Sequence, residues 1–509
     1  MNDNILSSSN GFLVFFNHCH MPSFSLAAVP RSSSPFFGYG NVITLILICA
    51  LNANFLFSAM HDQQRCVEIL AFCLTSIVFL IRTFKGEIPV LTTSVVILLL
   101  AFLTLGAISA SFANSLHYAV SEWSVILLSL MLVFGVASEL MRDMCRLPVL
   151  LHWVGIACVL YSLRALLMYA MALASGFQLD MHSLAAGFSN ARHLNHTQTA
   201  LLPLLVLLSL RAPKSSGWRK AWFAVAAFWW ALLFVCEARA SVVALFLGCV
   251  TAFALRRSNA LPFIAMMART ALLGTVLYAM LFLMFPILAG LQPISMPLNV
   301  VARTAADPTS ARNLLWKLAF ELIAAHPWLG VGPQHFAHEG ASLYAAAHPH
   351  NWMLQIGAEW GVPALFCLSG AVFLGARGLV RSGARIADGD RANQEILVAL
   401  LVACTAIFVD GLLSGVIVMP QSQLAITLVL GIACAWVRLQ QSDAQPSGPV
   451  STVLTRTFII ALVTIGLSGL MWSVAPDFVA RARGDALTPA ELAKNPTVHW
   501  PRMWEAGYF

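Results

Sequence analysis

The sequence predicts an all-α fold, a polytopic transmembrane helical bundle. Of the 509 residues, 59% are hydrophobic and 10% are charged, and the mean hydropathy is +0.80. A water-soluble domain does not have enough polar surface to cover so much apolar material. Apolar runs of about 20 residues, the length that crosses a bilayer, also recur along most of the chain. Lipid is therefore the expected solvent for most of it, and helices satisfy their backbone polar groups there.

The apolar runs predict about 12–13 spans. The first group lies near residues 39–60, 66–82, 88–109, 123–141, 147–174, 196–211, 221–237, 240–255 and 261–290. After a long interruption, further runs lie near residues 361–380, 395–418, 421–437 and 457–474.

The same pattern divides the chain into five parts. A Ser-rich cytoplasmic leader, residues 1–38, is either disordered or an artefact of start-site choice with Met21 as the true start. Residues 39–290 form an N-terminal transmembrane bundle, and residues 291–360 form a long outer loop with amphipathic helices. Residues 361–474 form the C-terminal transmembrane helices. Residues 475–509 form an outer tail.

The orientation follows from the positions of Lys and Arg, because loops rich in these residues stay in the cytoplasm. They gather in alternate loops, near residues 82–85, 142–146, 211–220, 256–257, 377–391 and 438–456. The loops 175–195, 291–360 and 475–509 then face outward, and the N-terminus lies in the cytoplasm. The net charge of +7 is thus mostly topological and does not indicate nucleic-acid binding.

The eleven cysteines do not indicate a metal or redox site. Most fall within spans or at span ends, and the long outer loop has none. No CxxC pair is present, so we expect them to act as small apolar packing residues.

Two features of the long outer loop are candidates for chemistry. The segment from Asp307 to Gly332 has apolar residues at helical spacing, a possible cap at Asp307 and a terminating Pro327, which predicts an amphipathic helix on the membrane. His348 and His350 then flank a proline just before the next span. A histidine can act as a base near neutral pH, with Asn351 to orient it. The alternatives are a surface loop that happens to hold histidines, or a metal pair, for which no third ligand is evident.

Three arginines lie in the outer loops, namely Arg192, Arg239 and Arg312. Arginine is costly at membrane depth, so these side chains are expected to face an anion in an aqueous cavity. Together they would suit a pyrophosphate, which takes bidentate hydrogen bonds. Taken singly, each can equally be a residue that snorkels to the interface.

Other polar and aromatic residues within spans have a simpler interpretation. Charged residues in predicted spans can line a cavity or pair with each other; these are Glu68, Arg164, Arg269 and Asp410. Four tryptophans are expected to be interfacial anchors, namely Trp229, Trp230, Trp316 and Trp328.

Four patches together resemble the superfamily of O-antigen ligases and O-antigen polymerases, which includes bacterial protein O-oligosaccharyltransferases. They are Phe188 to Arg192 with Asn195, the turn Ala238 to Ser241, the segment Arg312 to Pro333, and His350-Asn351 with Glu359 and Gly361. The third is similar to the family's Arg-x-x-x-Trp and Pro-x-x-Gly-x-Gly-Pro signature. The patches cover about residues 180–370. His193 and Ala238 depart from the commoner family residues, which affects substrate detail more than reaction class.

The resemblance implies a GT-C-like, inverting membrane glycosyltransferase of a Gram-negative inner membrane, with a periplasmic site and no cofactor or metal. Its donor would be a polyprenyl-pyrophosphate-linked glycan. His350 would be the catalytic base, while Arg192, Arg239 and Arg312 would hold the pyrophosphate. The supporting residues would be Asn190, Asn195, His348, Asn351 and Glu359.

The acceptor implied first is lipid A core, which makes the chain an O-antigen ligase surrounded by membrane lipids. The alternatives in the same class are transfer to a pilin-like protein and polymerisation of repeat units. From another class, a transporter or flippase of lipid-linked sugars would be expected to have duplicated halves with broken helices. No such duplication is evident in the sequence.

Overall fold

The computed structural model describes residues 51, 60–84, 93–178, 180–294, 301, 305, 312–341, 347–387, 389–441, 453–483, 501–505 and 507. Within this part of the chain the regular structure is helical and contains no strand, which confirms the predicted all-α class. The predicted leader, most of the first span and the cap at Asp307 lie outside the described residues.

Each predicted span from residue 66 onward corresponds to a long helix. In the first half these are α3 (Met60–Phe84), α4 (Thr93–Ser111), α5 (Leu116–Arg142), α6 (Arg146–Ser175), α8 (Ala191–Arg211), α9 (Gly217–Val235), α10 (Arg239–Arg256) and α11 (Leu261–Tyr278), which continues through η2 (Ala279–Met284) into α12 (Phe285–Leu288). In the second half they are α17 (Val362–Gly383), α18 (Arg391–Leu413), α19 (Pro420–Gln441) and α20 (Val453–Ala482). The short helices are α7 (Met181–Leu184), η1 (Arg257–Ala260), α14 (Arg312–Ala325), α15 (Phe336–Glu339) and α16 (Trp352–Trp360).

By length and hydropathy, nine helical segments of the described residues could cross a membrane. This is fewer than the predicted spans, partly because the segment Arg239–Leu288 combines two of them. Helices α8 and α9 also fall outside the nine. The first turns of α8 carry a polar run, Asn195 to Thr199, whose side chains are buried inside the bundle. Polar groups at that depth must be satisfied by the protein, which suggests that α8 borders a site rather than lipid.

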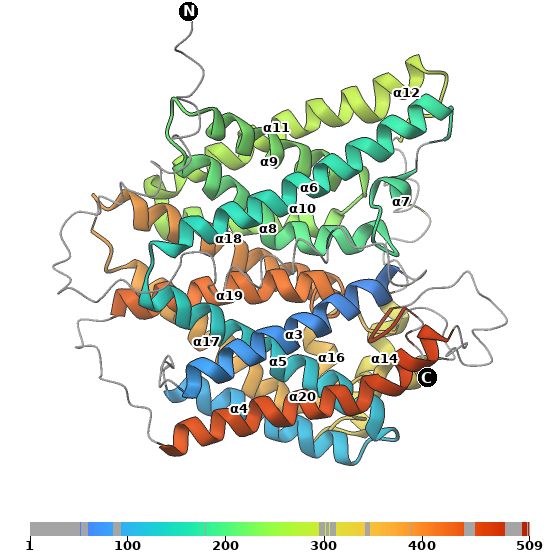
Figure 1. Ribbon diagram of the computed structural model, residues 1–509, viewed down its shortest axis with the longest axis vertical. Coiled ribbons are helices and arrows are strands. Elements are labelled where there is room, and N and C mark those ends of the chain that lie inside the picture. The colour runs from blue at the N-terminus through green and yellow to red at the C-terminus, as the bar shows by residue number, and fades with distance from the viewer. Residues whose placement is uncertain are drawn as a thin grey trace, which may run out of the picture.

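The long helices form two groups that lie one above the other in Figure 1. The upper group contains α6, α8, α9, α10, α11 and α18, in which α10 packs on α18 and α9 on α11. The lower group contains α3, α4, α5, α17, α19 and α20, in which α5 packs on α19 and α4 on α17. The groups are joined where α19 contacts α8 and α18.

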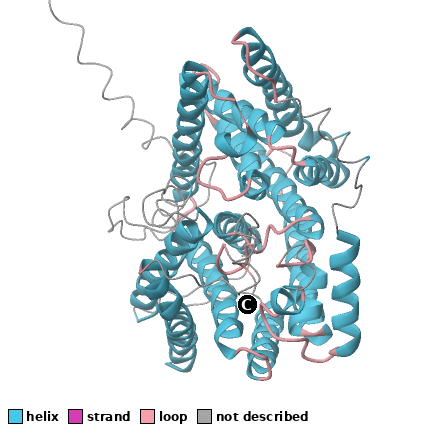
Figure 2. Cartoon of the chain, turned by 90° about the vertical axis from the view of Figure 1, so that its right-hand side faces the viewer, coloured by secondary structure: helices cyan, strands magenta, loops and turns pink. Residues whose placement is uncertain are grey.

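The two ends of the bundle differ in character. At one end the Lys/Arg-rich loops meet, and Arg256 Nη1 donates to the Gly383 carbonyl at 2.9 Å. At the other end, on the right in Figure 1 and facing the viewer in Figure 2, lie α7, α14 and the described C-terminal residues. This second end holds the loops that the charge pattern predicts to face outward.

A tight joint fixes the outward loops to the bundle. The turn after α14 packs against the end of α16, where Val331 N donates to the Ala358 carbonyl at 2.9 Å. Val362 N donates in turn to the Pro327 carbonyl at 2.8 Å. Gly361 has φ +86° and ψ +164°, a backbone region almost restricted to glycine. A Cβ at this position would lie 2.3 Å from the Trp328 carbonyl oxygen.

The prediction of interfacial anchors is wrong for both Trp229 and Trp230, which are buried in the core of the bundle. Trp229 is fully buried, and its Nε1 donates to the Cys158 carbonyl and to Ser162 Oγ, both at 3.1 Å. It therefore anchors α9 to α6 inside the protein rather than at a lipid interface. Apolar content alone cannot separate these two settings, because an indole satisfies its N–H in either one.

We expect Gly361→Ala to lower the thermal unfolding temperature of the purified protein in detergent. The left-handed backbone alone should cost about 1–3 kcal/mol, before the clash with Trp328 is counted. The matched control is Gly375→Ala in α17, where a Cβ meets nothing within 4 Å. Alanine inside a helix should leave stability unchanged or raise it by about 0.5–1 kcal/mol. Equal melting of the two variants would contradict this account of the joint.

Candidate active site

The loop Ala347–Asn351, here called the histidine loop, leads into α16 at the end of the bundle that the charge pattern predicts to face outward. His348 is buried and His350 is half-buried. His350 has φ +54°, a left-handed conformation that is uncommon for a side chain with a Cβ. Such strain costs about 1–3 kcal/mol, and it persists where the surroundings fix it, often at functional sites.

Two contacts hold this strained loop. Trp316 Nε1 on α14 donates to the Pro349 carbonyl at 3.0 Å, and the backbone N–H of His350 donates to His348 Nδ1 at 3.3 Å. The two imidazole rings meet edge to face with centroids 4.2 Å apart. Trp316, predicted to be an interfacial anchor, thus forms part of the support for the histidines.

Asn351 forms the N-cap of α16. Its Oδ1 accepts hydrogen bonds from the backbone N–H of Met353 at 2.9 Å and of Leu354 at 3.1 Å. Its contacts are thus those of a capping residue, whereas the sequence suggested that it orients the histidine. The cap also fixes where the helix begins, and so it determines where His350 stands.

The electrostatic surroundings of His350 favour its neutral form. Its pKa is lowered from 6.5 to about 3, chiefly by burial. The neighbours that lower it further are Arg312, His196 and Arg192. Two of the three predicted arginines therefore act on this histidine, which is neutral at neutral pH.

Arg192 lies in the first turn of α8. Asn190 caps this helix, and its Oδ1 accepts from the Arg192 backbone N–H at 3.0 Å. Asn195 is buried one turn further on and donates from Nδ2 to Gln198 Oε1 at 2.7 Å. The two predicted supporting asparagines thus shape the polar start of α8.

Arg239 is the first residue of α10, and its backbone N–H donates to the Glu237 carbonyl at 3.0 Å. Glu237 has φ +56°, a second left-handed residue at this end of the bundle. Arg239 is not among the groups that lower the pKa of His350. The structure connects it to the site less directly than Arg192 and Arg312.

Asp410, a fully buried residue of α18, connects the helix of Arg239 to the rest of the site. Its Oδ2 accepts from Thr199 Oγ1 at 2.9 Å on α8 and from Ser241 Oγ at 3.3 Å on α10. The same oxygen lies 3.6 Å from His196 Nδ1. Asp410 therefore ties the starts of α8 and α10 to each other, and with them the two arginines.

Arg312 is the first residue of α14, which packs on α16. Leu315, Ala319 and Leu322 bury one face of α14 in a small core with Phe336 and Ala358. The helix ends at Ala325, two residues before the predicted terminator Pro327. Since Trp316 contacts the histidine loop, packing of α14 positions the arginine and the loop together.

Glu359 is fully buried near the end of α16, and its partner is a residue that sequence reasoning missed. Arg502 Nη2 donates to Glu359 Oε2 at 2.5 Å and to Glu122 Oε2 of α5 at 2.7 Å. Glu359 Oε1 also accepts from the Phe336 backbone N–H at 3.0 Å. The predicted supporting residue thus belongs to an ionic cluster whose centre is Arg502, a residue of the predicted outer tail.

Some of the missed residues left a trace in the sequence. His196 follows Arg192 by four positions in a polar run, and such a spacing places two side chains on one face of a helix. Asp410 was evident as a charge within a span, but its partners were not. Arg502 and Glu122 left no signal, because their pairing joins segments 380 residues apart in the chain.

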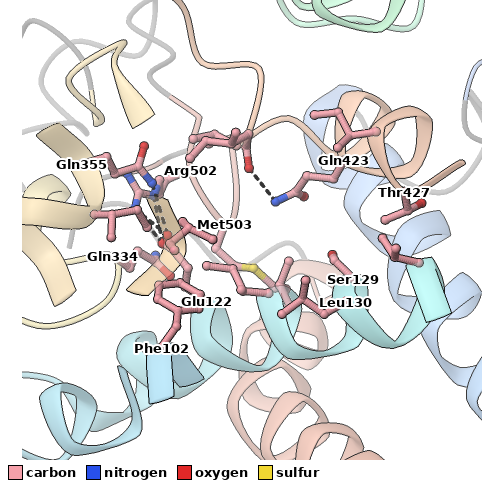
Figure 3. A pocket seen from close by; sticks show the side chains of 18 of the residues that line it. Phe102, Glu122, Ser129, Leu130, Gln334, Gln355, Gln423, Thr427, Arg502 and Met503 are labelled. Atoms are coloured by element: carbon pink, nitrogen blue, oxygen red, sulfur yellow. Dashed lines mark hydrogen bonds and ion pairs between the residues drawn. The ribbon is translucent and has the colours of Figure 1, made fainter. Parts of the chain in front are cut away.

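A cavity of about 200 Å³ lies beside the ionic cluster. One end is polar and is formed by Glu122, Gln334, Gln355 and Arg502, as Figure 3 shows. The remaining lining is largely apolar and includes Phe102, Val125, Leu130, Ile356, Leu368 and Ile426. The three predicted arginines do not line this cavity. Its lining suits a group that is mostly hydrocarbon with polar parts, since Arg65, Ser129, Gln423 and Thr427 also line it.

Among the residues that the structure describes, no group of three or more His, Cys, Asp or Glu side chains could hold a metal ion. The neighbours of the histidine pair include His196 as well as Arg312 and Arg192.

Residues 223–369 match the family model described as O-antigen ligase. The matched segment contains Arg239, Arg312 and the loop Ala347–Asn351, whereas Arg192 lies before it. No curated protein matches the chain. The match confirms the resemblance to the O-antigen ligase superfamily and does not distinguish ligases from polymerases.

We expect Asn351→Ala to destabilise the start of α16, because the backbone N–H groups of Met353 and Leu354 lose their acceptor. Loss of such a cap typically costs about 1 kcal/mol. Asn351→Asp keeps the acceptor and places a negative charge at a helix N-terminus, so it should retain stability. Thermal unfolding of both variants measures this. If Asn351→Asp is as unstable as Asn351→Ala, the residue has a role other than capping.

Proposed function

Because residues 223–369 form an O-antigen ligase family domain, we propose that this multi-pass membrane protein is an O-antigen ligase. It transfers a polyprenyl-pyrophosphate-linked glycan to lipid A core at the periplasmic face of a Gram-negative inner membrane. Glycosyl transfer of the ligase or polymerase type is the function of the family; the donor, the acceptor and the mechanism are our proposal.

The observation that carries the proposal is the state of His350. It has a strained left-handed backbone, its pKa is lowered to about 3, and it has Arg312 and Arg192 as neighbours. A neutral imidazole among positive charges can take a proton from a neutral acceptor hydroxyl beside a negatively charged donor. Such an arrangement serves group transfer better than it serves transport.

The reaction then proceeds by one displacement. The acceptor hydroxyl oxygen attacks the anomeric carbon of the glycan while His350 removes the hydroxyl proton. The new glycosidic bond forms as the bond between the anomeric carbon and the pyrophosphate oxygen breaks, and that oxygen leaves with the electron pair. Polyprenyl pyrophosphate departs, and the anomeric configuration is inverted. The proton on His350 returns to solvent.

The three arginines supply the charge that the leaving group needs. Each lies at the N-terminal start of a helix: Arg192 on α8, Arg239 on α10 and Arg312 on α14. A helix N-terminus carries a partial positive charge and free backbone N–H groups, and it favours phosphate. Guanidinium groups at these positions add bidentate donors to the same field. Preorganised charge of this kind stabilises the developing pyrophosphate without reorganisation during the reaction.

The cavity beside the ionic cluster supports a lipid substrate. Its apolar lining suits hydrocarbon, and its polar end lies next to Gln355 on α16, the helix that follows the histidine loop. This geometry favours an acceptor or donor with a hydrocarbon chain, and it does not by itself separate lipid A core from a protein or a growing glycan.

Reconstitution tests the proposal directly. Purified protein in liposomes receives a polyprenyl-pyrophosphate glycan and, in separate reactions, lipid A core, a pilin-like protein or no added acceptor. We expect product with lipid A core only, and a loss of roughly 10²-fold or more for His350→Ala, which removes the base. The matched control is His152→Ala, another half-buried histidine, which lies on α6 and contacts the Pro148 carbonyl. This control should retain activity.

The other outcomes separate the alternatives. Product with the pilin-like protein would make the chain a protein O-oligosaccharyltransferase, and chain growth without acceptor would make it a polymerase. Donor translocation in intact cells that survives His350→Ala, with no transfer in any reconstituted reaction, would favour a transporter. Full activity of His350→Ala would overturn the proposed base.

The pH dependence tests the electrostatic account. Because the pKa of His350 is lowered to about 3, the base stays neutral as the pH falls below 6.5. The acid limb of kcat/KM that belongs to this base should therefore lie well below pH 6.5. Arg312→Gln removes a positive neighbour, which raises the pKa of His350 and moves the limb to higher pH. An acid limb of the wild type at or above pH 6.5 would contradict this.

A further inference from the structure

The short segment Pro501–Glu505, here called the C-terminal insert, lies among the helix ends at the outward side of the bundle (Figure 2). All five of its residues are buried. The sequence predicted a simple outer tail for residues 475–509. These residues instead have specific partners on α3, α5 and α16.

Helix α3 holds the backbone of the insert. Arg65 Nε donates to the Met503 carbonyl and Arg65 Nη2 to the Arg502 carbonyl, both at 3.1 Å. Asp62 Oδ1 accepts from the Glu505 backbone N–H at 2.7 Å. The Arg502 N–H donates to the Trp504 carbonyl at 3.0 Å, which closes a tight turn. Contacts of its backbone alone thus fix the position of the C-terminal insert.

The Arg502 side chain then reaches the site. Its Nε donates to Glu122 Oε2 at 3.0 Å, and its Nη2 donates to Glu122 Oε1 at 2.7 Å, a bidentate contact with α5 (Figure 3). Nη1 donates to the Ala347 carbonyl at 3.2 Å. Nη2 also donates to Glu359 Oε2 at 2.5 Å. The fork of guanidinium donors is therefore used on three different segments.

Two of these segments flank the histidine loop. Ala347 immediately precedes His348, and Glu359 lies on α16, which begins directly after Asn351. Arg502 thus holds the entry and the exit of the loop at once. A guanidinium with five donors in a rigid plane can fix such a geometry, whereas the single ammonium of lysine cannot.

We propose that Arg502 is a positioning residue of the active site, which holds the loop Ala347–Asn351 so that His350 faces the acceptor hydroxyl. This inference rests on the proposed function. It assigns the C-terminal insert to the active site, although no family motif covers it and the matched family segment ends at residue 369.

Arg502 also affects the loop through its charge, which lowers the pKa of His348. The pKa of His348 is lowered well below 6.5, first by burial and then by His350, Arg502, His193 and His196. Neutral His348 accepts the backbone N–H of His350 at Nδ1. If His348 were protonated there, that hydrogen bond would be lost. Arg502 thus helps to maintain the contact that orients His350.

The test uses the full chain in liposomes with the acceptor that the wild type uses. Arg502→Lys keeps the charge and loses the fork, and Arg502→Gln loses both. The control is Arg146→Gln at the opposite end of the bundle, where Arg146 Nη1 pairs with Glu139 at 3.2 Å. For each variant, kcat, the KM for the donor, the pH profile and thermal unfolding are measured.

For Arg502→Lys we expect kcat to fall at least about tenfold while the KM for the donor changes less than about threefold, because only the placement of the base is disturbed. The pH profile should keep its wild-type position. Arg502→Gln should lower kcat as well and move the acid limb to higher pH, since a positive charge beside His348 is gone. Arg146→Gln should change neither kcat nor the pH profile.

Three results would overturn the inference. One is wild-type kcat in folded Arg502→Lys and Arg502→Gln. Another is an equal fall in activity at every pH that follows thermal stability alone. The third is failure of both variants to fold, which would make the cluster a structural core. The proposed function fails separately, if the wild type transfers no glycan or His350→Ala remains active.

Discussion

The buried cluster of Glu122, Arg502 and Glu359 is the constraint on which the outward end of this protein depends. Burying Arg502 and Glu359 carries a large desolvation penalty, which raises the pKa of the Glu359 carboxyl, and attraction within the cluster offsets it only when the geometry is complete. Arg502 is 2% exposed and Glu359 is fully buried, so neither can exchange a missing partner for solvent. α5, α16 and the C-terminal insert must therefore be in place together. Burial alone would lower the pKa of Arg502, but the two carboxylates outweigh this and raise it.

Positive charge dominates the part of the site around His350. Arg192, Arg239 and Arg312 each lie in the first turn of a helix, so side-chain charge and helix N-terminus together create a positive field at each of these helix starts. The same field that would attract a pyrophosphate also opposes protonation of His350. The proposed binding of an anionic donor and the neutral state of His350 would both follow from this arrangement. A negatively charged site would repel an anionic donor and would favour the protonated form of the histidine.

The sequence predicted the elements well and their partners poorly. Apolar runs located each long helix from residue 66 onward, because transfer into lipid constrains every residue of a span. Proline and glycine located the turn at Pro327 to Gly332, because these residues restrict the backbone conformation locally. Arg502 could not be found in this way, since an ion pair between α5 and a residue near the end of the chain leaves no periodicity. Trp316 was visible as an aromatic residue, but its bond to Pro349 depends on how α14 folds back.

The strain at His350 explains why so many contacts surround one loop. A left-handed backbone at a residue with a Cβ tends to relax, and relaxation here would change the position of the imidazole. Trp316 holds the middle of the loop, Asn351 fixes its exit, and Arg502 holds the carbonyl at its entry. Each contact comes from a different part of the chain, so the strained conformation exists only in the fully assembled bundle. Under the proposed mechanism, the base would therefore form only in the assembled bundle, together with the arginines that would receive the pyrophosphate.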